Sequence, residues 1–213
     1  MRVISGTFRG KKILEPKDIR TRPLKDLTKE SIFNIINHSK KFKINLENSN
    51  ILDLFSGVGS FGIECLSRGV KKVTFIENYN GVLPILKKNL ANLKLINNYH
   101  IIEKNIYDKS LFLKLENKFD IIFLDPPFRD KDLDKILLNI KDNKTLDKNG
   151  IIIVHRHKTE EDILPKNFKI IEKKNMVFQK LYLINFYLLN NSLMTVFDYY
   201  LFFQIYFLLH KKK

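Results

Sequence analysis

From residue 50 onwards, short apolar runs alternate with longer amphipathic segments, and this alternation limits the possible folds of the chain more than any other feature. Such runs are typical of strands, and the segments between them are typical of helices. Their regular succession indicates βαβ units and a parallel sheet. We predict parallel strands at residues 51–54, 72–76, 100–104, 120–124 and 150–154, and an antiparallel pair at 168–173 and 179–186.

The N-terminal part has a different pattern, in which basic side chains surround short strand-forming runs. We predict a β-hairpin over residues 1–14, where strand formers are interrupted by two glycines: Val3, Ile4, Gly6, Phe8, Gly10, Ile13 and Leu14. Residues 26–37 are expected to form a helix that packs on a core through one stripe: Leu27, Ile32, Phe33 and Ile36.

The formal net charge of the chain is +15, and more than half of this surplus lies in residues 1–44. That segment contains twelve Lys or Arg and four Asp or Glu, which give it a charge of +8. A surplus of this size attracts polyanions by Coulomb attraction and counterion release. General lysine enrichment explains the charge of the remaining chain, but it explains the N-terminal arginines less well. We therefore predict a polyanion-binding surface that includes Arg2, Arg9, Lys11, Lys12, Arg20 and Arg22.

The single cysteine and the C-terminal tail bear on the location of the protein. Cys65 excludes an internal disulfide and, together with the lack of a recognisable secretory signal, predicts a cytoplasmic protein. Residues 193–209 are nearly all apolar, and as a helix they would span about 25 Å of a hydrocarbon core of about 30 Å. Asp198 at mid-span would cost about 3 kcal/mol, so membrane contact is the less favoured role of the tail.

The stretch ILDLFSGVGSFG predicts a glycine-rich loop between a strand and a helix. Gly57, Gly59 and Gly62 have the G-x-G-x-x-G spacing, which lets the backbone turn tightly and approach a nucleotide. Glu77 ends the next strand, where a carboxylate can accept hydrogen bonds from both ribose hydroxyls. These features alone suit an NAD dehydrogenase equally well.

Asp53 helps to distinguish an NAD site from an S-adenosylmethionine site. It lies at the end of the first strand, four residues before Gly57. A carboxylate at this place would repel the pyrophosphate of a dinucleotide at the helix N-terminus. The ammonium group of S-adenosylmethionine would be attracted to it, so Asp53 favours that cofactor over NAD. An Asp that caps the helix or stabilises a turn is the alternative.

A second loop follows the strand FDIIFL and reads Asp125-Pro126-Pro127-Phe128. Its two prolines fix the backbone, which leaves the Asp125 carboxylate and the Pro126 carbonyl free to accept hydrogen bonds. Such a loop can hold a planar amine by its N–H groups while Phe128 stacks on the ring that bears it. A plain turn is the alternative, but the place after the fourth strand of a glycine-loop domain favours a functional site.

Together these residues resemble the RsmD family of bacterial 16S ribosomal RNA guanine-N2 methyltransferases, a branch of the class I S-adenosylmethionine-dependent enzymes. The likeness runs from residue 1 to about residue 188 and includes MRVISGTFRGKKI, RPLKDLTKESIFN, LDLFSGVGSFGIECLSRG, FIE and DPPF. It implies an α/β, Rossmann-like class I methyltransferase fold: a mostly parallel seven-stranded sheet with helices on both faces, plus the N-terminal hairpin. The implied segments are a basic RNA-facing extension at 1–44, the methyltransferase domain at 45–188 and the apolar tail at 189–213.

The resemblance also implies roles for single residues. Asp53, Gly57 and Gly59, with Phe55 in the same set, would surround the methionine portion of S-adenosyl-L-methionine, and Glu77 would bind its ribose. Asn105 and Ile106 would lie beside the adenine. The target guanine would be held by the loop residues Asp125, Pro126, Pro127 and Phe128, and Arg22 with Pro23 would shape the RNA approach. We expect a monomer, and its implied partner is 16S rRNA or an assembly intermediate of the small ribosomal subunit.

The chain departs from the family pattern at three places. It has Leu24 where the family often has Thr, and Asn78 and Tyr79 where acidic residues often follow the ribose-binding acid. The fifth strand, which commonly ends near a Glu, here runs into His155, Arg156 and His157. Without a third ligand at a fitting spacing, we expect the two histidines to be solvated or to face RNA, and we predict no metal site.

Other functions stay open on the sequence alone. A DNA adenine or cytosine amino-methyltransferase uses a similar Asp-Pro-Pro-aromatic loop, although the basic N-terminal segment and the lack of a sizeable target-recognition insert argue against it. A catalytically inactive RNA-binding module and an NAD dehydrogenase are the further alternatives.

Overall fold

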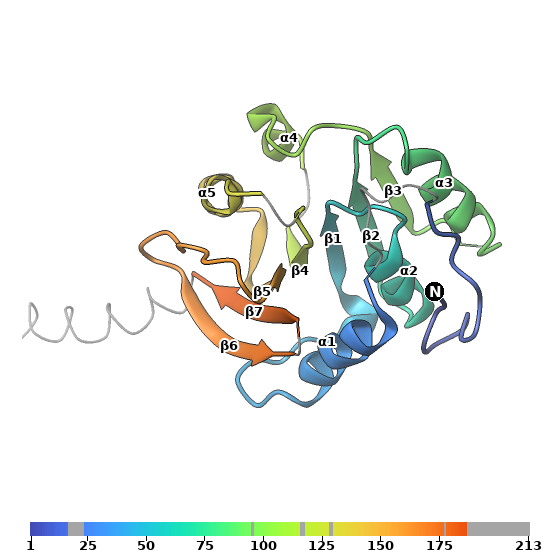
Figure 1. Cartoon of the computed structure of the whole chain (residues 1–213), viewed down its shortest axis with the longest axis horizontal. Helices are drawn as coiled ribbons and strands as arrows, with labels where there is room; N and C mark the ends of the chain where they lie inside the picture. Colours follow the sequence, from blue (N-terminus) through green and yellow to red (C-terminus); the bar gives the residue numbers. More distant parts are fainter. Residues whose placement is uncertain (17–23, 95, 116–117, 128–129, 177, 187–213) are drawn as a thin grey trace, which may run out of the picture.

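The computed structural model describes residues 1–16, 24–94, 96–115, 118–127, 130–176 and 178–186. A seven-stranded sheet in the order β3-β2-β1-β4-β5-β7-β6 runs through the molecule (Figure 1). Strands β1 to β5 are parallel, and β7 is antiparallel to both β5 and β6. The bounds of the strands are Asn50–Leu54 (β1), Lys72–Ile76 (β2), Tyr99–Ile102 (β3), Phe119–Leu124 (β4), Leu146–His157 (β5), Lys169–Asn175 (β6) and Gln179–Asn185 (β7).

These strands confirm the predicted mostly parallel seven-stranded sheet. The largest difference is β5, which begins at Leu146 and ends at His157, so it extends past both ends of the predicted 150–154. Its extra residues pair with β4 at one end and with β7 at the other. Pairing partners outside the segment itself therefore set the length of this strand.

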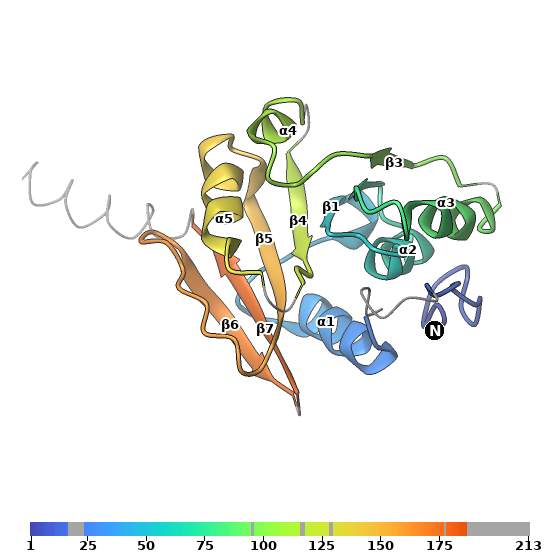
Figure 2. The same ribbon diagram turned by 45° about the horizontal axis from the view of Figure 1, so that its top comes forward.

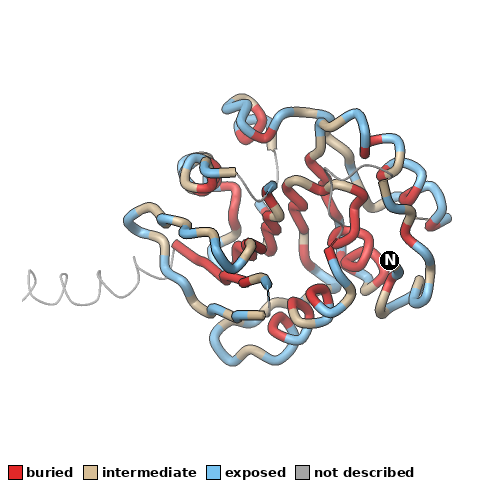
Figure 3. Tube along the Cα trace, viewed as in Figure 1, coloured by how far each residue is buried: buried red, intermediate tan, exposed pale blue. Residues whose placement is uncertain are grey.

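Helices cover both faces of the sheet, as expected (Figure 2). Alternate strand residues point to opposite faces, and the core divides accordingly into two clusters. One cluster joins the odd-numbered residues of β1, β4 and β5 to helices α1 (Asp26–His38), α2 (Ser60–Ser67) and α3 (Leu83–Ala91). The other joins the even-numbered residues of these strands to α4 (Lys109–Leu113) and α5 (Leu133–Asp142). A short 3-10 helix, η1 (Leu46–Asn48), precedes β1. Figure 3 shows that burial is concentrated in the sheet and in the helix faces that pack against it.

Helix α1 packs on the core through Ile32, Phe33 and Ile36, as predicted, but not through Leu27. Leu27 is 77% exposed, whereas Lys29 is fully buried. With 3.6 residues per turn, Leu27 lies about 120° around the helix from Phe33, while Lys29 lies one turn before it on the core side. The Lys29 ammonium donates to the Arg2 carbonyl at 2.5 Å and lies 3.2 Å from the Asp26 carboxylate, so its burial is compensated.

The N-terminal segment folds back on itself, but it does not form two regular strands. One antiparallel bridge joins Arg2 and Lys12. The segment is attached to α2 by the fully buried Glu64, whose carboxylate accepts from the Ile4 and Ser5 backbone N–H groups at 2.7 and 3.0 Å. Gly6 comes so close to α2 that an added Cβ would lie 1.8 Å from the Ser67 carbonyl oxygen. Backbone hydrogen bonds such as Val3 N–H to the Lys11 carbonyl and Ile13 N–H to the Met1 carbonyl also join the two arms, so the segment is a short irregular hairpin held against α2.

Candidate active site

The parallel register brings the predicted site residues to one edge of the sheet. The last residues that pair within the parallel part of the sheet are in line with each other: Leu54 on β1, Ile76 on β2, Leu124 on β4 and Val154 on β5. The next residue of each chain therefore stands at the carboxyl edge, and these residues are Phe55, Glu77, Asp125 and His155. Strand β1 lies between β2 and β4, so the order along the chain reverses there. Open α/β sheets bind ligands at such a switch point.

Asp53 lies beneath this edge and is only 1% exposed. Its Oδ2 accepts from the Gly62 backbone N–H in the first turn of α2 at 3.0 Å, which is the capping role left open above. Burial raises the pKa of Asp53 well above its ordinary value, and the charges of Asp125 and Glu77 raise it further against the lowering effect of the Gly62 hydrogen bond. Three carboxylates thus act on one small region, which favours a cationic ligand over an anionic one.

The glycine-rich loop needs its glycines for two different reasons. Gly59 has a φ of +84° and directly precedes α2, a left-handed conformation that glycine adopts without strain. Gly62 lies within α2, where an added Cβ would be 2.2 Å from Cε1 of Phe75 on β2. The first glycine shapes the loop and the other lets the helix pack closely on the sheet. Phe55 also has a positive φ, of 59°, so the loop is strained at a residue that is not glycine.

Glu77 connects the glycine-rich loop to the end of β2. Its Oε2 accepts from the Gly57 N–H at 2.7 Å, and its Oε1 accepts from the Asn78 and Tyr79 N–H groups at 2.9 Å each. A carboxylate has about four lone-pair sites, so about one remains beside these three hydrogen bonds, and a ribose hydroxyl could occupy it.

The loop after β3 lies beside the loop after β1. Asn105 is exposed, and its Oδ1 accepts from the Tyr107 N–H at 3.0 Å, while Ile106 is buried in the core cluster of α4 and α5. The Tyr107 ring lies edge-on to Phe55 with 6.2 Å between centroids, and its hydroxyl donates to Asp130. The predicted adenine neighbours are therefore joined, through Tyr107, to both the glycine-rich loop and the loop after β4.

His155 is placed differently from our expectation of a solvated or RNA-facing histidine. It is 3% exposed, and its Nδ1 lies 2.7 Å from Oδ1 of Asp125. The expectation was wrong because β4 and β5 are neighbours with Leu124 opposite Val154, so the residues after them face each other. His157, two positions on, is partly exposed, and its Nδ1 lies 2.7 Å from the Thr159 hydroxyl oxygen.

Arg156 is a second residue that the sequence analysis missed. It is 2% exposed on the opposite face of β5, and its guanidinium donates to the Pro127 carbonyl at 3.3 Å and the Asp130 carbonyl at 2.7 Å. Its Nε donates to Asp162 at 2.8 Å. The signal that could have identified both residues is the polar pair His155-Arg156, which directly follows the apolar run of β5.

Asp125 and Pro126 therefore begin a loop that is held from both faces of β5. The Asp125 side chain is 21% exposed, Pro126 is buried and Pro127 is exposed. Phe128 lies outside the described residues. Within the described part of the chain, no group of three or more His, Cys, Asp or Glu side chains is arranged to hold a metal ion.

The predicted basic surface is only partly described. Arg2, Arg9 and Lys12 are exposed, and Arg2 lies 3.8 Å from Asp26. Lys11 donates to the Asn92 carbonyl and lies 5.5 Å from the centre of the Phe8 ring. Arg20 and Arg22, with Pro23, lie outside the described residues, as does the tail at 189–213. Across the described chain, the helices are too short or too polar to cross a bilayer.

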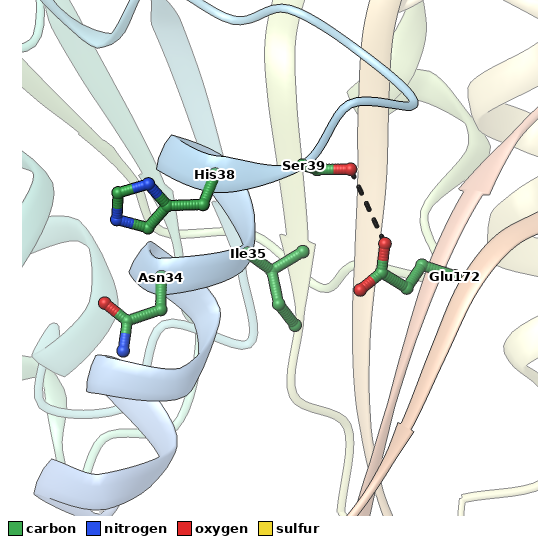
Figure 4. Close-up of a pocket in the computed structure, with 5 residues that line it drawn as sticks. All are labelled: Asn34, Ile35, His38, Ser39 and Glu172. Atoms are coloured by element: carbon green, nitrogen blue, oxygen red, sulfur yellow. Dashed lines mark hydrogen bonds between the residues drawn. The ribbon is translucent and has the colours of Figure 1, made fainter.

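A hollow lies away from this edge, between the C-terminal half of α1 and β6 (Figure 4). Ser39 donates to Glu172 across it at 3.5 Å. It contains none of the predicted site residues: its lining is Asn34, Ile35, His38, Ser39 and Glu172.

Comparison with known proteins shows the family of the chain. A family model described as "Conserved hypothetical protein 95" matches residues 1–185. The chain is 35% identical over 178 residues to "Ribosomal RNA small subunit methyltransferase D" of Haemophilus influenzae, covering 82% of this chain and 88% of that protein. It is 34% identical over 163 residues to "Putative rRNA methyltransferase YlbH" of Bacillus subtilis, covering 76% and 85%. Among solved structures it is similar to "Putative methyltransferase yhhF" of Escherichia coli, with a TM-score of 0.72, 29% identity and coverage of 86% and 96%.

Proposed function

We propose a methyl transfer to ribosomal RNA, proceeding from the fact that this chain belongs to the RsmD family, whose model matches residues 1–185. The Haemophilus influenzae relative is named as a ribosomal RNA methyltransferase and the Bacillus subtilis relative as a putative one. S-adenosylmethionine is the methyl donor for this chain as for its family. The finer proposal is that the acceptor is the exocyclic N2 of a guanine in 16S rRNA, in the free RNA or in an assembly intermediate of the small subunit.

One observation carries this proposal: Asp125 and Glu77 follow the two strands that flank β1 at the same sheet edge, and both lie close enough to Asp53 for their charges to act on it. This negative region fits the sulfonium and ammonium charges of S-adenosylmethionine and would repel a dinucleotide pyrophosphate. Asp53 would face the ammonium group, Glu77 the ribose, and Asn105 with Ile106 the adenine, with Phe55, Gly57 and Gly59 around the methionine portion. Bound there, the cofactor supplies a methyl group activated on sulfur.

The loop after β4 provides the second half of the site. An aromatic amine is a poor nucleophile because its lone pair is delocalised into the ring. The Asp125 carboxylate and the Pro126 carbonyl would accept its two N–H groups and hold the nitrogen about 3 to 3.5 Å from the methyl carbon. Pro127 keeps the loop rigid, and Phe128 is proposed to stack on the guanine. Positioning is thus the main contribution of the protein.

The basic N-terminal segment is proposed to bind the RNA backbone. Its exposed Arg2, Arg9 and Lys12 are attached to α2 through Glu64, and α2 begins directly after the glycine-rich loop. Phosphate contacts made by this segment would therefore set the RNA in a fixed position relative to the site. A ribosomal substrate also implies a cytoplasmic location.

The test is methyl transfer from labelled S-adenosylmethionine to small-subunit RNA, followed by mass analysis of the modified nucleosides. We expect N2-methylguanosine with the wild type. Asp125→Ala should abolish transfer and leave cofactor binding in equilibrium dialysis nearly unchanged, while the exposed Asp142→Ala on α5 serves as the matched control. Undiminished turnover in Asp125→Ala would refute the assignment. Methylated adenine or cytosine in DNA would support the alternative DNA methyltransferase, and lack of cofactor binding by the wild type would support an inactive RNA-binding module.

A further inference from the structure

The buried imidazole of His155 contacts the carboxylate of Asp125, an arrangement that the sequence did not predict. His155 stands at the carboxyl edge on β5, and its backbone is fixed by pairing with Leu181 on β7. Its side chain is 4% exposed, with Nδ1 2.7 Å from Oδ1 of Asp125. The other ring nitrogen, Nε2, is buried and has no hydrogen-bond partner within the described chain. Through Nδ1, the imidazole therefore hydrogen-bonds the carboxylate proposed to hold the target amine, while Gln179 on β7 also interacts with the ring.

We propose that His155 is a positioning residue for methyl transfer: its Nδ1–H donates to Oδ1 of Asp125, which fixes the carboxylate rotamer and leaves Oδ2 to accept the N–H of the target amine. This inference rests on the proposed function, because it assigns the residue that orients the acceptor carboxylate. An ionised carboxylate can only accept hydrogen bonds, so a neutral histidine must present the Nδ1–H tautomer to it.

The contacts of Arg156 indicate that His155 orients the Asp125 side chain and is not needed to hold the backbone of the loop after β4. The backbone of the loop is held by the guanidinium on the other face of β5, through the carbonyls of Pro127 and Asp130. Removing the imidazole leaves these hydrogen bonds in place. The loop keeps its course without His155, but the Asp125 side chain loses the donor that selects its rotamer.

The surroundings of His155 determine how it responds to pH. Burial lowers the pKa of His155, but the charge and hydrogen bond of Asp125 raise it by more, with a raising contribution from Gln179 on β7 and a lowering one from Arg156. Gln179 is in turn held from α1, because the Thr28 hydroxyl donates to its Oε1 at 2.9 Å. The net pKa lies above the ordinary histidine value. A protonated imidazole withdraws electron density from Asp125 and makes it a weaker acceptor, so kcat should rise as pH increases through this pKa.

The experiment compares His155→Leu with His155→Asn, because the Asn side chain can place an N–H near the position of Nδ1 whereas Leu cannot. His155→Leu should lower kcat about 100-fold, the usual cost of a misplaced group, with KM for S-adenosylmethionine unchanged. His155→Asn should recover most of this loss, and its kcat should lack the rise with pH seen in the wild type. The matched control is His100→Asn, a histidine exposed on β3, which should keep the wild-type profile.

The outcomes separate this inference from the proposed function. A wild-type protein that transfers no methyl group to RNA overturns the proposed function itself. An active wild type whose His155→Leu variant keeps its kcat and pH profile overturns the role of His155 alone. So does a His155→Asn variant that retains the rise of kcat with pH, and this second measurement decides the question even if His155→Leu fails to fold.

Discussion

Replacing Arg156 by Met tests whether the charge network behind the loop after β4 holds the fold together. Methionine keeps much of the volume but removes the guanidinium, which contacts Asp162 at 2.8 Å and the carbonyls of Pro127 and Asp130. The Asp162 side chain is 5% exposed, and its nearest remaining cation is Lys180, 3.7 Å away. The substitution therefore leaves a buried carboxylate with only a partial counter-charge.

The magnitude follows from this burial. Removing one partner of a buried ion pair costs about 3 to 5 kcal/mol, and the remaining Lys180 contact places Arg156→Met near the lower end, at about 3 kcal/mol. For a protein of this size, 1 kcal/mol shifts Tm by about 2 to 4 °C, so a fall of roughly 6 to 12 °C is expected. Urea unfolding followed by circular dichroism measures the free energy, and thermal melting measures the shift.

A double-mutant cycle identifies the cause of the loss. If the uncompensated Asp162 charge is responsible, Asp162→Asn should cost much less in the Arg156→Met background than in the wild type. Arg156→Lys serves as the control, since it keeps the charge but loses the fork that reaches both carbonyls. A loss under about 1 kcal/mol for Arg156→Met, or equal costs of Asp162→Asn in the two backgrounds, would refute this account.

Three further predictions concern packing, cofactor binding and RNA binding. Gly62→Ala should cost about 1 to 3 kcal/mol of unfolding free energy, because the new methyl group would meet the Phe75 ring at 2.2 Å; unchanged urea unfolding would contradict this. Because the pKa of Asp53 is raised in the folded protein, the contribution of Asp53 to stability is fully present below the ordinary carboxyl pKa and is lost as pH rises through the raised value. Asp53→Asn should therefore raise Tm of the cofactor-free protein at neutral pH, with the gain vanishing in acid, while dialysis shows weaker binding of S-adenosylmethionine; a lower Tm at neutral pH would contradict the argument. Arg9→Ala and Lys12→Ala should each weaken RNA binding and reduce the salt slope of its affinity by about one, and a slope equal to that of the wild type would exclude these residues from the interface.

The strands of the sheet could be predicted from the sequence because each strand is a short run of apolar residues that is visible locally. The predicted strand at 72–76 has the same bounds as β2, and the predicted strand at 120–124 begins one residue after β4 does. The glycine spacing and the proline pair likewise demand particular backbone shapes wherever they occur. Helix α1 shows the limit of this reading, because Lys29 occupies the core-facing position and the apolar Leu27 does not.

The order of elements, the residue types in the loops at the carboxyl edge and the family of the chain could all be predicted from the sequence, since each depends on residues that are close together in the chain. Which groups distant in sequence come into contact could be learned only from the folded chain: the His155 and Asp125 side chains, 30 residues apart, and the Glu64 carboxylate with the Ser5 backbone N–H, 59 residues apart. These pairings depend on strand adjacency and on where the N-terminal segment docks. Burial makes them matter, because a polar group removed from water must find a partner, and only the folded chain determines which partner is within reach.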